Sequence, residues 1–329
     1  MMNVVMIIPT GIGCSIGGHA GDANPVAKLL GSVCDNLILH PNVVNAADIN
    51  EMPENGWYVE GGLLDRFLDG EFYLKKPKSN KILLLVNKPI RPETINAVSA
   101  ARHTIGCNIE ICELDIQFDM EGFYNEDGTA GGLFYGIDSL IEQIEKYEFD
   151  AAAMATQIKV KKETALNYFK TGGVNPWGKI EAIVSRAITD RINKPFAHAP
   201  VETDDQEIKY LNEIVNPRIA AEFISTCYIH CVFKGLHKAP RISYETGISV
   251  DDIDCLVTPV NCLGPPHLSC LYKKIPIIAV ADNVPITNTP TPKEFIVVKN
   301  YIEAAGLISL LKTGMTIKSV VSDLQPFGG

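Results

Sequence analysis

The chain has 329 residues, a formal net charge of -10, and 46% hydrophobic residues. This composition is typical of a folded protein with a full core, and it excludes an intrinsically disordered chain. No stretch concentrates the 29 basic residues on one face, so nucleic acid is not expected as a partner.

The apolar runs, the first segment and the cysteines indicate where in the cell the protein is expected. The longest apolar runs, residues 81–88 and 275–281, are too short to cross a bilayer. The first segment, MMNVVMII, lacks the basic region and cleavage site of a secretory signal, so we expect a cytoplasmic location and no membrane partner. Nine cysteines, an odd number lying mostly in apolar segments, favour reduced, buried thiols over disulfides.

Apolar runs of strand length alternate with helical patterns along the chain. The first predicted elements are a strand at 4–8, a helix from Pro25 to about Cys34, and a strand at 36–40. The elements predicted next, in order, are strand 81–88, helix 91–106, strand 108–115, helix 138–149, strand 150–160, helix 178–193, strand 194–200, helix 216–237, strand 254–261, strand 275–283 and helix 301–314. Residues 116–136 are acidic, aromatic and glycine-rich, and we expect an irregular loop there.

Strands that are apolar along their whole length are buried on both faces, as in a parallel sheet covered by helices. The predicted class is therefore α/β with mainly parallel sheets, arranged as two Rossmann-like lobes with a cleft between them. The expected lobes are residues 1–150 and 151–329, with exchange of segments between them left open.

Polar residues follow several predicted strands, at the edge where α/β proteins bind ligands. The loop TGIGCSIGGHAGDANP, residues 10–25, follows the first strand and is expected to offer backbone N–H groups to a carboxylate or a developing oxyanion. It does not match the dinucleotide fingerprint, because Ile16 stands where the third glycine belongs. The residues of this loop expected to line a substrate pocket are Gly13, Cys14, Gly17 and Gly18.

Three residues are the predicted catalytic set. Cys262 follows a buried strand in PVNCLGPPHL and is the predicted nucleophile, with a buried structural thiol as the alternative. His198 in FAHAP is the predicted general base, because a histidine titrates near neutrality. Asp22 either caps a helix or faces the substrate. Further substrate-binding residues are expected at His40, Asn42, Glu60, Asn261 and Gly264, and carboxylates able to orient these groups at Asp65, Glu181 and Glu222.

Metal binding is a competing use of the same atoms. One group with the spacing C-x6-C-x4-H-x2-C consists of Cys255, Cys262, His267 and Cys270, and a second consists of Cys227, His230 and Cys231. Neither has the paired C-x2-C spacing of structural zinc sites. A divalent metal held by His40, His198 and Asp22 is left open, and no organic cofactor is expected.

Five stretches, GGHAGDANPVAKLL, HPNVVNAADI, YVEGGLLDRF, KPFAHAP and GLHKAP, resemble an uncharacterised protein family of cyanobacteria, plastid-bearing plants and other bacteria. The resemblance spans nearly the whole chain and implies no activity. The residues that match the family pattern best are Gly18, Gly21, Asp22, His40, Asn42, Glu60 and His198. Residues 254–280 also loosely resemble the second-cysteine region of aspartate and glutamate racemases, which would place Cys14 and Cys262 on opposite faces of a substrate carbon.

The leading hypothesis is an enzyme in which Cys262 and His198 hydrolyse an amide-like bond in a small polar metabolite. The alternatives are a cofactor-independent racemase or isomerase, a metal-dependent hydrolase or lyase, and a non-catalytic metabolite-binding protein. The expected partner is a small molecule. A homo-oligomer is left open, as is the participation of Cys14 and His19.

Overall fold

The computed structural model describes residues 1–19, 21–201, 214, 217–224 and 228–321. Its largest sheet has six parallel strands in the order β15-β14-β13-β1-β2-β3. The bounds of these strands are β1 Asn3–Met6, β2 Asn36–Leu39, β3 Gly56–Tyr58, β13 Cys255–Pro259, β14 Ile277–Val280 and β15 Ile296–Val298.

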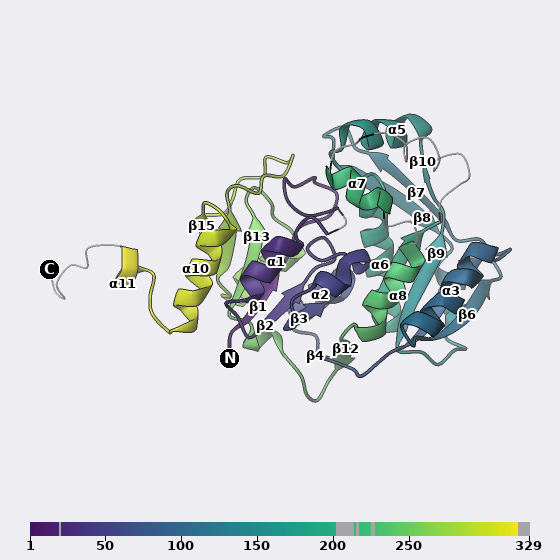
Figure 1. Cartoon of the computed structure of the whole chain (residues 1–329), viewed down its shortest axis with the longest axis horizontal. Coiled ribbons are helices and arrows are strands. Elements are labelled where there is room, and N and C mark those ends of the chain that lie inside the picture. The colour runs from purple at the N-terminus through teal and green to yellow at the C-terminus, as the bar shows by residue number, and fades with distance from the viewer. Residues whose placement is uncertain (20, 202–213, 215–216, 225–227, 322–329) are drawn as a thin grey trace.

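A second sheet has four parallel strands in the order β11-β9-β5-β6. Its strands are β5 Lys81–Asn87, β6 Asn108–Leu114, β9 Ala151–Thr156 and β11 Phe196–Pro200. The predicted α/β class with mainly parallel sheets is confirmed. The two sheets occupy opposite sides of the molecule in Figure 1, with α2, α6 and α8 between them.

The sheets do not divide at residue 150, where the boundary between lobes was expected. β9 begins at Ala151 but pairs with β5, while β13 to β15 join the sheet that holds β1. The first sheet therefore takes its strands from both ends of the chain, and the second takes them from the middle. A parallel pair such as β1 with β13 joins residues about 250 apart and leaves no local signal in the sequence.

The segment 116–136, expected to be an irregular loop, is mostly a hairpin. β7, Asp119–Tyr124, pairs antiparallel with β8, Ala130–Tyr135, and parallel with β10, Ile158–Val160. Gly128 has φ +80°, which favours glycine and lets the chain reverse between the two strands. A further two-stranded sheet pairs β4, Tyr73–Lys75, with β12, Arg241–Ser243.

The helices cover the faces of both parallel sheets (Figure 1). The helix predicted over 216–237 is described as α7 and α8, and residues 225–227 between them lie outside the described residues. The helices are α1 Asn24–Gly31, α2 Gly61–Asp69, α3 Pro92–Thr104, α4 Ile137–Ile144, α5 Lys162–Thr171, α6 Gly178–Ile192, α7 Pro217–Ile224, α8 Tyr228–Lys238, α9 Pro265–Tyr272, α10 Tyr301–Lys312 and α11 Lys318–Val321, with short 3₁₀ turns at Ala46–Glu51 and Val250–Asp252.

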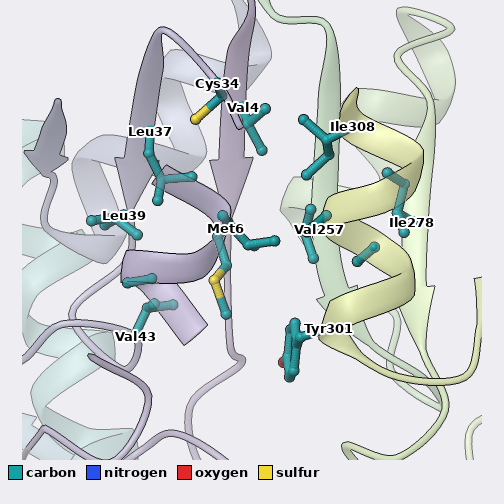
Figure 2. Packing of buried hydrophobic residues seen from close by; sticks show 14 of the residues in the cluster. Val4, Met6, Cys34, Leu37, Leu39, Val43, Val257, Ile278, Tyr301 and Ile308 are labelled. Carbon is teal, nitrogen blue, oxygen red and sulfur yellow. The ribbon is translucent and has the colours of Figure 1, made fainter. Parts of the chain in front are cut away.

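The core of the first sheet explains why its strands are apolar throughout. Val4 and Met6 of β1 point to the same face as Leu37 of β2, where Ile308 of α10 packs over the sheet (Figure 2). All four of these residues are fully buried. Each contributes about 1.5–3 kcal/mol relative to an exposed position.

Close packing of α2 against α6 joins the two sheets. A Cβ at Gly62 would lie 2.8 Å from the Cα of Arg186, so a residue larger than glycine would force the two helices apart. Arg66 of α2 also donates to the carbonyl of Thr189 and to Oδ1 of Asn193 at the end of α6. These contacts hold α2 against the C-terminal half of α6.

Candidate functional site

A cavity of about 490 Å³ lies where the carboxyl ends of strands from both parallel sheets meet. His40 follows β2, Glu60 follows β3, and His198 lies in β11, so both sheets contribute to its lining. Of the residues predicted to form the site, those that line the cavity are Gly13, Cys14, Gly17, Gly18, His40, Asn42, Glu60 and His198. Those that do not are Asp22, Asn261, Cys262 and Gly264.

Glu60 is a buried carboxyl group at the start of α2. Its side chain accepts a hydrogen bond from Tyr58, while Oε1 has no partner among the described residues. The residue is only 6% exposed. Burial raises the pKa of Glu60 to about 8. The hydrogen bond from Tyr58 lowers this pKa, and the nearby charge of Glu181 raises it further. Glu60 is therefore mostly protonated at neutral pH.

Glu181, in the first turn of α6, lies at the end of a chain of hydrogen bonds. Its Oε1 is 3.0 Å from Nδ1 of His198, and Nε2 of His198 is 2.9 Å from Oγ1 of Thr156. The His198 side chain is fully buried, whereas that of Glu181 is 28% exposed. Because both ring nitrogens of His198 are engaged, His198 holds Glu181 in place, and Glu181 is the group that faces the cavity.

His40 presents a fixed hydrogen-bond donor. Its Nδ1 accepts from the backbone N–H of Asn42 at 3.1 Å, so the proton of the neutral ring is on Nε2. Burial lowers the pKa of His40 to about 4, which keeps the ring neutral. A Cβ at Gly61 would lie 3.0 Å from Nε2, so this nitrogen lies beside the first turn of α2, which has no side-chain cap.

The glycine-rich loop lines the cavity but does not supply the N–H groups expected of it. The backbone amides from Ser15 to His19 all donate within the protein. Their acceptors are, in order, the Val284 carbonyl, Oδ1 of Asn283, Oδ2 of Asp22, the Asn42 carbonyl and Oδ1 of Asp22. That prediction is wrong for these five amides, because two of them donate to Asp22 within the loop and three donate to residues outside it.

Asp22 stabilises this loop and does not line the cavity. Besides the two loop amides, its Oδ2 accepts from Nε of Arg218 at 2.8 Å. The same guanidinium donates to the carbonyls of Cys14 and Gly17. Asp22 and Arg218 thus hold the loop against α7, and Asp22 lies outside the cavity lining where a substrate contact was predicted.

Cys262 is a structural thiol. It is 3% exposed, its Sγ donates to the Pro259 carbonyl at 3.0 Å, and burial raises its pKa to about 11. The neighbouring histidine is His267, 3.7 Å away, and not the predicted His198. His267 Nδ1 accepts from the N–H of Gly264, so its Nε2 carries a proton and cannot take one from the thiol.

The other expectations for cysteine chemistry also lose their support. Burial raises the pKa of Cys14 to about 12, so neither Cys14 nor Cys262 readily forms a thiolate near neutral pH. A two-thiol racemase needs one of its two cysteines as a thiolate, to act as the base. The backbone N–H and Oδ1 of Asn261 both form hydrogen bonds with the hydroxyl of Thr291, and Gly264 is the N-cap of α9.

No group of three or more histidine, cysteine or acidic side chains is placed to hold a metal ion within the described part of the chain. Cys255 and Cys270 are buried in the core of the first sheet, and His230 lies 3.3 Å from Oγ1 of Thr104. His198 has both nitrogens engaged, so it does not join His40 and Asp22 around a metal. Cys227 and the side chain of Glu222 lie outside the described residues.

The cavity lining includes aromatic residues that the sequence analysis did not single out. Tyr168, Phe169 and Trp177 line the cavity together with Tyr58. The segment KTGGVNPWG before α6 contains a signal for Trp177, since it resembles the glycine-rich turn and helix start that follow the first strand. Asn175 stabilises the turn before α6 by accepting from the amides of Trp177 and Gly178.

Fold and site together define an α/β protein with a ligand-sized cavity between two parallel sheets. A family model described as a protein of unknown function (DUF3326) matches residues 3–321, and the chain belongs to this family. It is also similar to an uncharacterized lipoprotein of Synechococcus sp., with 32% identity over 94% of this chain and 91% of the relative. No solved structure is significantly similar. The resemblance to an uncharacterised family is thereby confirmed.

The comparison corrects one expectation. The Synechococcus relative is named a lipoprotein, and this name contradicts the prediction of a cytoplasmic location. Among the described helices, none is both long enough and apolar enough to cross a bilayer.

Proposed function

We propose that this protein is an enzyme that hydrolyses an amide-like C–N bond of a small metabolite by acid–base catalysis, without an organic cofactor. One observation carries the proposal: two unlike carboxyl groups line one cavity. Glu60 is buried with Oε1 unpartnered by the described residues, and Glu181 is partly exposed and held by His198. Two carboxyl groups whose surroundings differ in this way can supply the acid and the base of one reaction.

In the proposed reaction, Glu181 takes a proton from a water molecule as the water oxygen attacks the carbonyl carbon. The charge that forms on the carbonyl oxygen is stabilised by the Nε2–H of His40 and by the amides in the first turn of α2. Glu60 gives its proton to the leaving nitrogen, and the C–N bond breaks. The products are a carboxylic acid and an amine, and transfer of the water proton from Glu181 to Glu60 restores the pair.

The roles differ from those predicted from sequence. Water replaces Cys262 as the nucleophile, since that thiol is buried and outside the cavity lining. His198 is a positioning residue, because its two nitrogens contact Thr156 and Glu181. Isomerisation is the alternative that the same acid and base could perform, by moving a proton between two carbon positions.

The test is a screen of linear and cyclic amides in water labelled with a heavy oxygen isotope and deuterium, followed by mass spectrometry. Hydrolysis places the heavy oxygen in the carboxylic acid product, whereas isomerisation places deuterium on carbon without adding water. We expect Glu60→Gln to lower turnover by about 10²- to 10⁴-fold, the usual contribution of a general acid. The control is Glu163→Gln, on the exposed first turn of α5. Full turnover by Glu60→Gln, or deuterium exchange alone, would overturn the proposal.

A further inference from the structure

One wall of the cavity is aromatic. Tyr168 and Phe169 at the end of α5 and Trp177 before α6 have ring centroids 5.6 to 5.7 Å apart. Rings at this distance pack on one another and leave no room for a ligand between them. Phe169 and Trp177 are partly exposed and line the cavity, so a ligand meets their outer faces.

The charged lining residues determine which ligand charge the cavity tolerates. Glu60 and Glu181 line it, while no lysine or arginine does among the residues that the structure describes. A phosphate or carboxylate group would be buried here beside Glu181 without a cation, at a high cost in free energy. A ligand cation is not required either, because Glu60 is mostly protonated and Glu181 already accepts from His198.

His19 adds a polar group to the aromatic wall. Its ring stacks on Tyr168, with centroids 6.0 Å apart and planes 17° apart. The residue is 6% exposed and lines the cavity, and Nδ1 has no hydrogen-bond partner among the described residues. Burial and the charge of Arg218 lower its pKa to about 4, so the ring is neutral. A buried ring nitrogen of this kind needs a partner, and a ligand can supply one.

We propose that the cavity binds a flat heteroaromatic compound without negative charge, in the class of unphosphorylated nucleobases and nucleosides, stacked on Trp177 with a polar edge toward His19. This substrate class rests on the proposed function, because Glu181 lies one helical turn from Trp177 and would act on a bond next to the stacked ring. The cavity volume of about 490 Å³ is within the range of sites for small organic ligands.

The test uses the intrinsic fluorescence of Trp177. The chain has two tryptophans, and Trp57→Phe leaves Trp177 as the only one. Neutral bases and nucleosides are titrated beside their phosphorylated counterparts, for example adenosine beside adenosine monophosphate, and agmatine serves as an acyclic cation. We expect quenching by at least one neutral ring compound, with affinity at least about tenfold above that of its phosphate.

Thermal shift measurements on Trp177 variants supply a second readout. Trp177→Phe keeps a stacking ring and is expected to retain most of the shift, whereas Trp177→Leu is expected to lose it while still unfolding cooperatively. Equal or tighter binding of the phosphates, tighter binding of agmatine, or no binding by any neutral ring compound would overturn the proposal.

The two proposals can fail separately. Binding of a neutral ring compound that persists in Glu60→Gln, without turnover of any amide, would support the ligand class and contradict the proposed hydrolysis. Glu60-dependent turnover restricted to acyclic or anionic amides would support the hydrolysis and contradict the ligand class.

Discussion

Replacing Glu60 by glutamine should change how the stability of the protein depends on pH. Glu60 is 6% exposed, and its pKa rises from the ordinary 4.5 to about 8 in the folded state. Between these values the folded state binds more protons than the unfolded state, so stability falls as pH rises. Each pH unit in this interval costs about 1.4 kcal/mol, and the whole step amounts to about 5 kcal/mol.

The assay is urea denaturation of wild type and Glu60→Gln from about pH 5 to about pH 9. The pair is compared because buried His19, His40 and His267, with pKa values lowered to about 4, change stability in the opposite direction below pH 6.5. We expect similar stabilities near pH 5 and a relative advantage of several kcal/mol for Glu60→Gln near pH 9. If the free energy of unfolding depended on pH in the same way for wild type and Glu60→Gln, the reasoning would be refuted. The control is Glu163→Gln at an exposed position, whose pH dependence should match that of wild type.

Three further predictions concern packing and catalytic roles. Gly62→Ala brings a Cβ against the backbone of α6 and should lower the free energy of unfolding, measured in urea, by about 1–3 kcal/mol. Gly306→Ala in α10 has open space around it and should not lower this free energy. Equal effects of the two substitutions would contradict the packing argument. Cys262→Ala should keep turnover within about threefold, and a loss comparable with that of Glu60→Gln would restore the thiol as a candidate nucleophile. His198→Ala should lower kcat by about 100-fold by releasing Glu181, with little change in ligand affinity, and an unchanged kcat would remove its positioning role.

The fold class could be predicted because burial leaves a local mark on each strand. β5 is apolar from Ile82 to Val86, and all five residues are buried by helices on both faces of the sheet. The partners of each strand could not be predicted, because β1 lies between β2 and the distant β13. The hairpin at 119–135 was missed because its glycines and acidic residues are also typical of loops.

Part of the site could be predicted because its residues follow strands of a parallel sheet. His40 and Glu60 follow neighbouring parallel strands, and the ends of such strands share one edge of the sheet. Cys262 also follows a strand of that sheet, but its thiol turns back to the carbonyl of Pro259, and sequence does not reveal such a direction. Glu181 resembles an ordinary charge in the first turn of a helix until the buried His198 on β11 is placed beside it.

The most direct measurement of the central claim is infrared difference spectroscopy of the folded protein between about pH 6 and about pH 9, with wild type and Glu60→Gln compared. We predict a protonated-carboxyl C=O band in wild type that disappears with an apparent pKa of about 8 and is absent from Glu60→Gln. The same band in both proteins, or none in wild type at the lower pH, would contradict the assignment of Glu60 as the acid of this cavity.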